Sequence, residues 1–220
     1  MIRCDIISVL NTDNVKYNKR NAIISDFLSI EKKCDIDFNV SKAVTPIDWK
    51  MKGKDVIYDG ETFNVRAASG HEHGITNYLS HYKIWREMGR HLVLEDDIIY
   101  DMELFNKLPD LIEKFDKIKI NNKLLYLQTS CPWREGFPDK EYQHLIDYSE
   151  DFYILHNKVF NDVSGTAAYY MNINEQLLGS LKKEIGATDG ILDNLLKSES
   201  LFFFIPKDFV KWFKLNSEVQ

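Results

Sequence analysis

Two features that assign many chains to specialised classes are missing here: paired cysteines and long apolar runs. Only 3 of the 220 residues are cysteine, at positions 4, 34 and 131. Their separation matches no metal-site spacing, so we expect buried thiols in a reducing compartment rather than disulfides. No stretch approaches about 18 consecutive apolar residues, which argues against a membrane span. The first ten residues have the pattern of a strand and lack the charged start of a signal peptide.

An excess of basic residues is also missing. The chain has 28 Lys and Arg against 34 Asp and Glu, a formal net charge of −6. Domains that bind nucleic acid nonspecifically are usually basic, so we expect no nucleic-acid partner. A phosphate-bearing ligand is compatible with this balance if a metal ion or a local cation neutralises it. We expect a cytoplasmic protein, with peripheral association at the inner face of a membrane left open.

Strand and helix patterns alternate along the chain. A length of 220 residues with 44% hydrophobic and 28% charged content is typical of one globular domain. The alternation predicts an α/β class with a mixed, mostly parallel sheet that opens with a parallel strand–helix–strand unit. Residues 45–73 are predicted to be mainly loop with one short strand near 56–58, and residues 130–150 an irregular aromatic loop. Strands are expected at 2–10, 36–44, 123–129, 152–160, 166–171 and 201–205, and helices at 22–30, 103–117, 174–184 and 188–197.

The most informative stretch is residues 91–97, His-Leu-Val-Leu-Glu-Asp-Asp. Its short apolar run predicts a buried strand. Adjacent carboxylates repel each other and resist burial, so Glu95, Asp96 and Asp97 are expected where this strand leaves the core. Ligands of open α/β sheets bind outside the carboxyl ends of strands, and carboxylates suit a hard divalent cation. An ordinary acidic loop is the alternative interpretation.

The segment before this strand adds specificity. Residues 70–89 have the apolar spacing of an amphipathic helix, closed by Gly89. Helix and acidic strand together resemble glycosyltransferase family 25, whose members carry a glycine-led helix with Leu-Ser-His-Tyr and then a strand ending in Leu-Glu-Asp-Asp. The matching residues are Gly74, residues 79–82, Trp85 and residues 94–97. This family includes bacterial lipooligosaccharide galactosyltransferases and animal collagen hydroxylysine galactosyltransferases.

The resemblance implies a fold and a reaction. The fold is a single nucleotide-diphosphosugar transferase (GT-A) domain over residues 1–220, with about 1–100 binding the nucleotide sugar and about 101–220 facing the acceptor. The reaction is inverting transfer of galactose or glucose from a UDP-sugar to a hydroxyl of a glycan, lipooligosaccharide or hydroxylysine. The implied cofactor is Mn²⁺ or Mg²⁺, with Asp97 as first metal ligand and Glu95 as second. Glu95 and Asp96 are alternatively expected to orient the site or contact the ribose.

Two further blocks resemble donor-binding segments of the family. Asn11 and Arg20 are implied to contact the sugar nucleotide; a solvated basic loop is the alternative. Gly165 and Thr166 begin a Gly-Thr-Ala-Ala-Tyr segment, where small residues let the backbone approach a ligand. A tight turn into a core strand is the alternative for that block.

The resemblance also implies two candidate catalytic residues. Asp189 lies in a segment similar to the family's Val-Asp-x-x-Leu and is the candidate general base, with Asp193 ranked second. Capping of the following helix by Thr188 or Asp189 is the alternative. His81 matches the histidine of the Ser-His motif, but a packed, hydrogen-bonded histidine is an equally open interpretation.

Two other functions are weighed against transfer. A nucleotidyltransferase usually has a glycine-rich basic loop after its first strand, whereas residues 11–14 here are Asn-Thr-Asp-Asn. A catalytically inactive UDP-sugar-binding or interaction module of the same fold is the second alternative. The intact acidic triplet favours an active enzyme.

Overall fold

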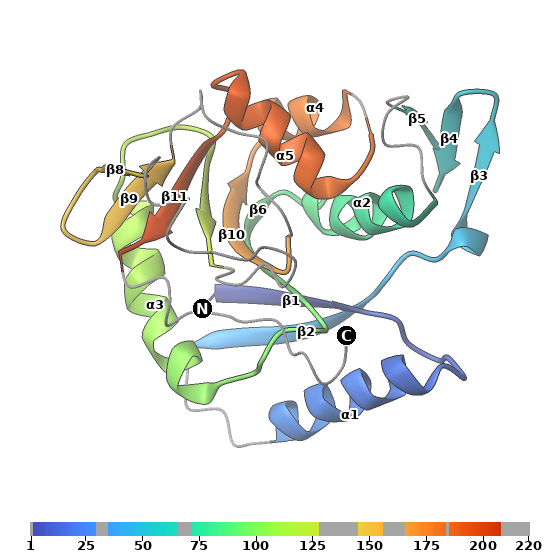
Figure 1. Cartoon of the computed structure of the whole chain (residues 1–220), viewed down its shortest axis with the longest axis horizontal. Helices are drawn as coiled ribbons and strands as arrows, with labels where there is room; N and C mark the ends of the chain where they lie inside the picture. The colour runs from blue at the N-terminus through green and yellow to red at the C-terminus, as the bar shows by residue number, and fades with distance from the viewer. Residues whose placement is uncertain are drawn as a thin grey trace.

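The structure is a computed structural model that describes residues 2–29, 35–65, 72–127, 145–155, 166–183 and 185–207. Its centre is an eight-stranded sheet in the order β2-β1-β6-β10-β7-β11-β9-β8 (Figure 1). All of these strands except β9 and β10 run in the same direction, which confirms a mixed, mostly parallel sheet. The strands are β1 (Ile2–Ser8), β2 (Ile36–Lys42), β6 (Gly89–Glu95), β7 (Lys123–Tyr126), β8 (Leu145–Asp147), β9 (Phe152–Leu155), β10 (Ala168–Ile173) and β11 (Phe202–Pro206).

Helices cover both faces of this sheet, which makes the fold a three-layer α/β/α sandwich of the GT-A type (Figure 1). One face carries α2 (Glu72–Trp85), α4 (Glu175–Lys182) and α5 (Thr188–Lys197). The other face carries α1 (Val15–Ser29) and α3 (Met102–Asp116). A separate hydrophobic cluster fills the space on each side, because every central strand buries side chains on both faces. No helix in the described ranges is long and apolar enough to cross a membrane.

The predicted parallel opening is confirmed. β1 and β2 pair in parallel from Ile2 opposite Ile36 to Ser8 opposite Lys42, and α1 connects them. The predicted start of this helix was wrong, since α1 begins at Val15 rather than after residue 21. Its first turn and a half is exposed or half-buried, and only Arg20, Ile24 and Phe27 are buried. Apolar periodicity therefore marks only the second half of the helix.

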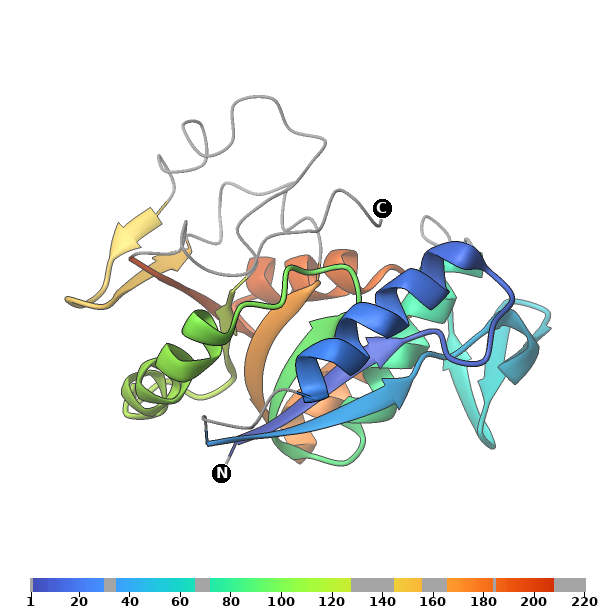
Figure 2. The same cartoon turned by 90° about the horizontal axis from the view of Figure 1, so that it is seen from below.

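Short strands at the two ends of the molecule were missed by the sequence analysis. β3 (Trp49–Lys52), β4 (Asp55–Tyr58) and β5 (Glu61–Asn64) form an antiparallel sheet, of which only β4 was expected. β8 lies in the segment predicted to be irregular. Figure 2 shows the small sheet and the β8–β9 hairpin at opposite ends of the fold. Most residues of β3, β5 and β8 are exposed, so these strands lack the alternation by which a half-buried strand is found.

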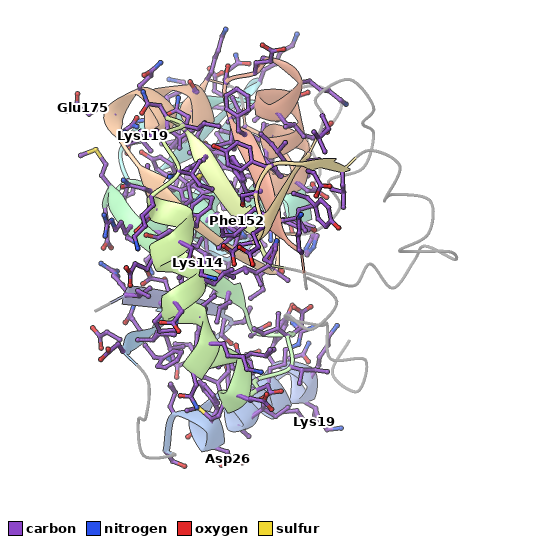
Figure 3. All side chains as sticks on the ribbon, turned by 90° about the vertical axis from the view of Figure 1, so that its left-hand side faces the viewer. Lys19, Asp26, Lys114, Lys119, Phe152 and Glu175 are labelled. Atoms are coloured by element: carbon purple, nitrogen blue, oxygen red, sulfur yellow. The ribbon has the colours of Figure 1, made fainter. Side chains whose placement is uncertain are left out.

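The remaining elements lie within a few residues of their expected bounds. α2 begins two residues before Gly74, and Gly89 has a φ of +92°, which suits a glycine in the turn between α2 and β6. α3 packs against β9, which lies next to the edge strand β8, through the rings of Phe115 and Phe152. Figure 3 shows Lys114 of α3 beside Phe152 of β9, where Lys114 forms an ion pair with Asp151.

Candidate functional site

The candidate site lies at the edge of the sheet where two parallel strands end. β1 ends at Ser8 and β6 ends at Glu95, and the two strands pair in parallel with Ile7 opposite Glu95. Asp96 and Asp97 follow in the turn that leaves β6. The expectation that the acidic triplet lies where a buried strand ends is confirmed, but the expectation that all three carboxylates avoid burial was wrong for Asp96, which is buried.

Asp96 is held by partners on both carboxylate oxygens. Its Oδ1 accepts from Arg20 Nη1 at 2.6 Å, and its Oδ2 lies 2.7 Å from Ser8 Oγ. Asp96 and Arg20 are both buried, with 7% of each residue exposed. A buried carboxylate is tolerable when it is paired and hydrogen-bonded in this way. Asp96 therefore anchors the turn after β6, which matches its expected orienting role.

Asp97 has one oxygen without a partner. Arg20 Nη2 lies 3.3 Å from Oδ2, whereas Oδ1 is buried and has no hydrogen-bond partner in the part of the chain that the structure describes. Burial, together with repulsion from Glu95 and Asp96, outweighs the attraction of Arg20 and raises the pKa of Asp97 to about 6. A buried, unsatisfied anionic oxygen is an arrangement that a bound cation would relieve.

The pKa of Glu95 is shifted in the opposite direction to that of Asp97. Its Oε1 accepts three hydrogen bonds, from Thr166 Oγ1 at 2.9 Å, His81 Nε2 at 3.1 Å and Asn77 Nδ2 at 3.3 Å. Burial acts to raise the pKa of Glu95, but these donors and His81 hold it below its usual value. The Glu95 side chain is 23% exposed. It is therefore an anion fixed through one oxygen and accessible from the sheet edge.

The two outer carboxylates fit a divalent cation that is shared with a phosphate ligand. Among the described residues, no group of three or more His, Cys, Asp or Glu could enclose an ion by itself. Mg²⁺ in phosphate sites commonly takes one or two protein carboxylates and completes its shell with water and substrate oxygens. The unpartnered Oδ1 of Asp97 and the exposed side of Glu95 suit such an ion.

His81 is fully buried and has both ring nitrogens occupied. Nδ1 lies 2.9 Å from Tyr169 Oη, and Nε2 faces Glu95. With 0% of its side chain exposed, His81 has no surface for a substrate. This placement favours the packed, hydrogen-bonded interpretation over a direct catalytic role.

The start of α5 is connected to Glu95 through the side chain of Asn77. Thr188 Oγ1 donates to Asn77 Oδ1, and Asn77 in turn donates to Glu95. Asp189 occupies the first turn of α5, half-buried, with its Oδ1 accepting from the Gly190 N–H at 2.8 Å. The tertiary structure thus brings the candidate base into the neighbourhood of residues that are nearly a hundred positions earlier in the chain.

The capping alternative for this segment holds in part, because Asp189 Oδ1 accepts from the Gly190 N–H in the first turn of α5. The residue at the N-cap of α5 is Ala187, which makes no side-chain cap bond, and Thr188 and Asp189 are already inside the helix. Asp193, the second candidate base, forms an ion pair with Lys197 at 2.6 Å. Its other oxygen, Oδ1, is buried with no hydrogen-bond partner among the described residues.

The other predicted donor contacts are only partly assembled. Thr166 belongs to the Glu95 cluster, whereas Gly165 lies outside the described residues. Asn11 is exposed in the loop after β1, with a φ of +55°. Arg20 contacts the acids rather than open solvent, which argues against the solvated-loop alternative.

Three site residues were missed by sequence reasoning. The Ser8 hydroxyl lies between two acceptors, Asp96 Oδ2 at 2.7 Å and Asn21 Oδ1 at 2.6 Å, and donates its one hydrogen to one of them at a time. Asn77 joins α2, β6 and α5. Its position one helical turn before His81 on the predicted helix placed it on the same face, which was the available signal.

The α/β/α layers, with an acidic turn at the carboxyl end of β6, are consistent with a GT-A-like fold. The family described as Glycosyltransferase family 25 (LPS biosynthesis protein) matches residues 14–191. This match covers most of the chain, so the protein belongs to glycosyltransferase family 25. The matched range contains the acidic triplet and the other candidate site residues except Asn11 and Asp193. A search of curated proteins finds no match.

Proposed function

We propose that the protein is an active, metal-dependent, inverting hexosyltransferase. It moves galactose or glucose from a UDP-sugar to a hydroxyl of a glycan acceptor, and the family description supports a lipopolysaccharide-type acceptor. The observation that carries the proposal is the buried Oδ1 of Asp97 after β6, which has no hydrogen-bond partner among the residues that the structure describes. A stable fold has little reason to keep such an oxygen unless a ligand satisfies it.

In this proposal Asp97 and the exposed oxygen of Glu95 hold Mn²⁺ or Mg²⁺ together with the donor diphosphate. The bound ion would supply Lewis-acid stabilisation of the negative charge that develops on the leaving UDP. Arg20 keeps Asp96 and Asp97 in place and offsets part of their charge. Asn11 and the 165–166 segment contribute to donor binding, and residues of the C-terminal half face the acceptor.

The transfer step requires one base and no covalent intermediate. The acceptor oxygen attacks the anomeric carbon from the face opposite UDP, and the new C–O bond forms as the bond to the phosphate oxygen breaks. The electron pair of the broken bond leaves with UDP, and the acceptor proton passes to the carboxylate of Asp189. A half-buried carboxylate in the first turn of a helix is accessible enough for this role.

The alternatives receive less support. A module that binds no nucleotide sugar has no need for an unsatisfied carboxylate oxygen beside two other acids, and an inactive UDP-sugar-binding module differs from the enzyme in showing no transfer to an acceptor. A nucleotidyltransferase would be expected to cradle a triphosphate on a glycine-rich loop after β1, and residues 9–14 contain no glycine.

Calorimetry with UDP-galactose, UDP-glucose, UDP-N-acetylglucosamine and GDP-mannose, each with Mn²⁺ and with EDTA, tests the proposal. We expect Mn²⁺-dependent binding of one UDP-hexose that is lost in Asp97→Ala and retained in Asp26→Ala. Asp26 is a matched control because it is an exposed aspartate on α1 (Figure 3). A folded protein that binds none of the four would refute the proposal. Binding of one donor without transfer to any acceptor would favour the inactive module.

A further inference from the structure

A chain of buried polar contacts runs behind Glu95, away from the sheet edge. Trp85 Nε1 donates to Tyr169 Oη at 2.8 Å, and Tyr169 Oη lies 2.9 Å from His81 Nδ1. The opposite ring nitrogen, Nε2, lies 3.1 Å from Glu95 Oε1. Trp85 and His81 are 0% exposed and Tyr169 is 1% exposed, so water does not compete for these groups. The contacts join α2, β10 and the end of β6 in one line.

The chemistry of these groups determines where each hydrogen lies. An indole N–H only donates, so the Tyr169 oxygen accepts from Trp85. The hydroxyl hydrogen of Tyr169 then needs an acceptor, and His81 Nδ1 is the acceptor within reach. Because Nδ1 accepts, the ring hydrogen belongs on Nε2, where it is directed at the carboxylate of Glu95. All donors and acceptors of the line are satisfied by this one assignment.

Packing prevents the imidazole from turning away. The His81 and Tyr169 rings are stacked with centroids 5.7 Å apart, and the Trp85 ring lies 5.8 Å from His81 on the same helix. Oε1 of Glu95 therefore receives a fixed donor from His81 in addition to Thr166 and Asn77. With three donors on Oε1, the second oxygen is the one left for a ligand at the sheet edge.

We propose that Trp85, Tyr169 and His81 act together as a positioning relay that fixes the carboxylate of Glu95 and presents a single oxygen, Oε2, to the donor site. His81 is then a positioning residue rather than a catalytic one. The relay is independent of a ligand, although its use in metal and donor binding rests on the proposed function. Loss of any hydrogen bond in the relay loosens Glu95 without removing a group that touches the donor.

The first test is the position of the ring hydrogen in the unliganded protein. Imidazole ¹⁵N NMR separates the two neutral forms, and the His81 signals are those that disappear in His81→Asn. We expect the hydrogen on Nε2 in the native protein near neutral pH. A hydrogen on Nδ1, or rapid exchange between the two forms, would overturn the relay. This measurement needs no ligand, and the only relay variant that it uses is His81→Asn, for assignment.

The second test compares Tyr169→Phe with Tyr170→Phe. Both tyrosines are buried on β10, but the Tyr170 hydroxyl bonds Asp116 of α3 on the opposite face of the sheet. In Tyr169→Phe we expect the His81 signals to show mixed hydrogen positions. We also expect Mn²⁺-dependent UDP-sugar binding weakened by at least about tenfold, as is typical when an outer-shell partner of a metal ligand is lost.

Tyr170→Phe is expected to leave both readouts unchanged. If the two variants changed UDP-sugar binding and the His81 ¹⁵N signals equally, Tyr169 would have only a packing role, and the relay would be overturned. If the native protein binds no UDP-sugar, the proposed function fails, while the ¹⁵N spectra of native protein and Tyr169→Phe still decide whether the relay exists.

Discussion

Asp97→Asn is expected to stabilise the protein without metal and to abolish its stabilisation by metal. The substitution keeps the size of the side chain and removes its charge. In the native protein the pKa of Asp97 is raised from 3.8 to about 6, because the carboxylate is buried beside Glu95 and Asp96. A difference of about 2 pKa units at about 1.4 kcal/mol per unit makes the charged form cost about 3 kcal/mol of folding free energy.

The sign and the pH window follow from this raised pKa. The folded state binds the Asp97 proton more tightly than the unfolded state, so stability is lost as pH rises through about 6. The gap in unfolding free energy between Asp97→Asn and native protein is therefore largest at pH 8, about 3 kcal/mol. It falls to about half at pH 5 and disappears below about pH 4. Titrating groups remote from Asp97 are common to both proteins and cancel in the difference; Glu95 and Asp96 are coupled to Asp97 and do not cancel fully.

Urea unfolding in EDTA at pH 8 and pH 5 measures the gap, with Asp26→Asn as a control that should show no gap at either pH. Addition of Mn²⁺ with UDP at 100 times its Kd should nearly close the gap at pH 8, because the ligand stabilises only the binding protein, by about 2.7 kcal/mol; at 1,000 times its Kd, where this stabilisation is about 4.1 kcal/mol, the order should reverse. If Asp97→Asn were no more stable than the native protein at pH 8 in EDTA, the electrostatic strain inferred at Asp97 would be refuted. A native protein that gained nothing from Mn²⁺ and UDP would instead count against the metal site.

Two further predictions concern the ends of the site. Arg20→Gln leaves buried carboxylates without their cation, so we expect the free energy of unfolding in urea to fall by roughly 3 kcal/mol or more. The control is Lys19→Gln, at the exposed neighbour on α1 (Figure 3), which should change the free energy of unfolding by less than about 0.5 kcal/mol. Equal losses in the two variants would mean that the Arg20 ion pairs are unimportant. Asp189→Asn should lower kcat by a factor of about 10² to 10⁴, as expected for loss of a general base, while the Kd of the UDP-sugar stays within about twofold. If Asp193→Asn gives that result instead, the base is Asp193.

The elements that the sequence predicted well are those whose own residues carry the pattern. β1, β6 and α3 have continuous or regularly spaced apolar residues, and their expected bounds agree closely with the structure. The exposed strands β3, β5 and β8 and the polar first turns of α1 carry no such pattern, so they were missed or misplaced. The spacing of apolar residues in the sequence indicates which face of an element is buried, so an element that buries few side chains is hard to predict.

For the candidate site, too, the sequence determined some features and the tertiary structure determined the others. The sequence by itself determined that the acidic triplet lies at the end of a buried strand, and its motifs indicated the family. The sequence did not determine that Asp96 is paired with Arg20, that Asp97 has a raised pKa, or that Glu95 is held by three hydrogen-bond donors. Arg20 lies 76 positions before Asp96, and His81 lies 88 positions before Tyr169. These residues meet only because β1, β6 and β10 are neighbours in the sheet and α1 and α2 cross opposite faces of it. Strand order and register depend on packing of the whole chain, so only the tertiary structure decided the charge and the orientation of each site residue.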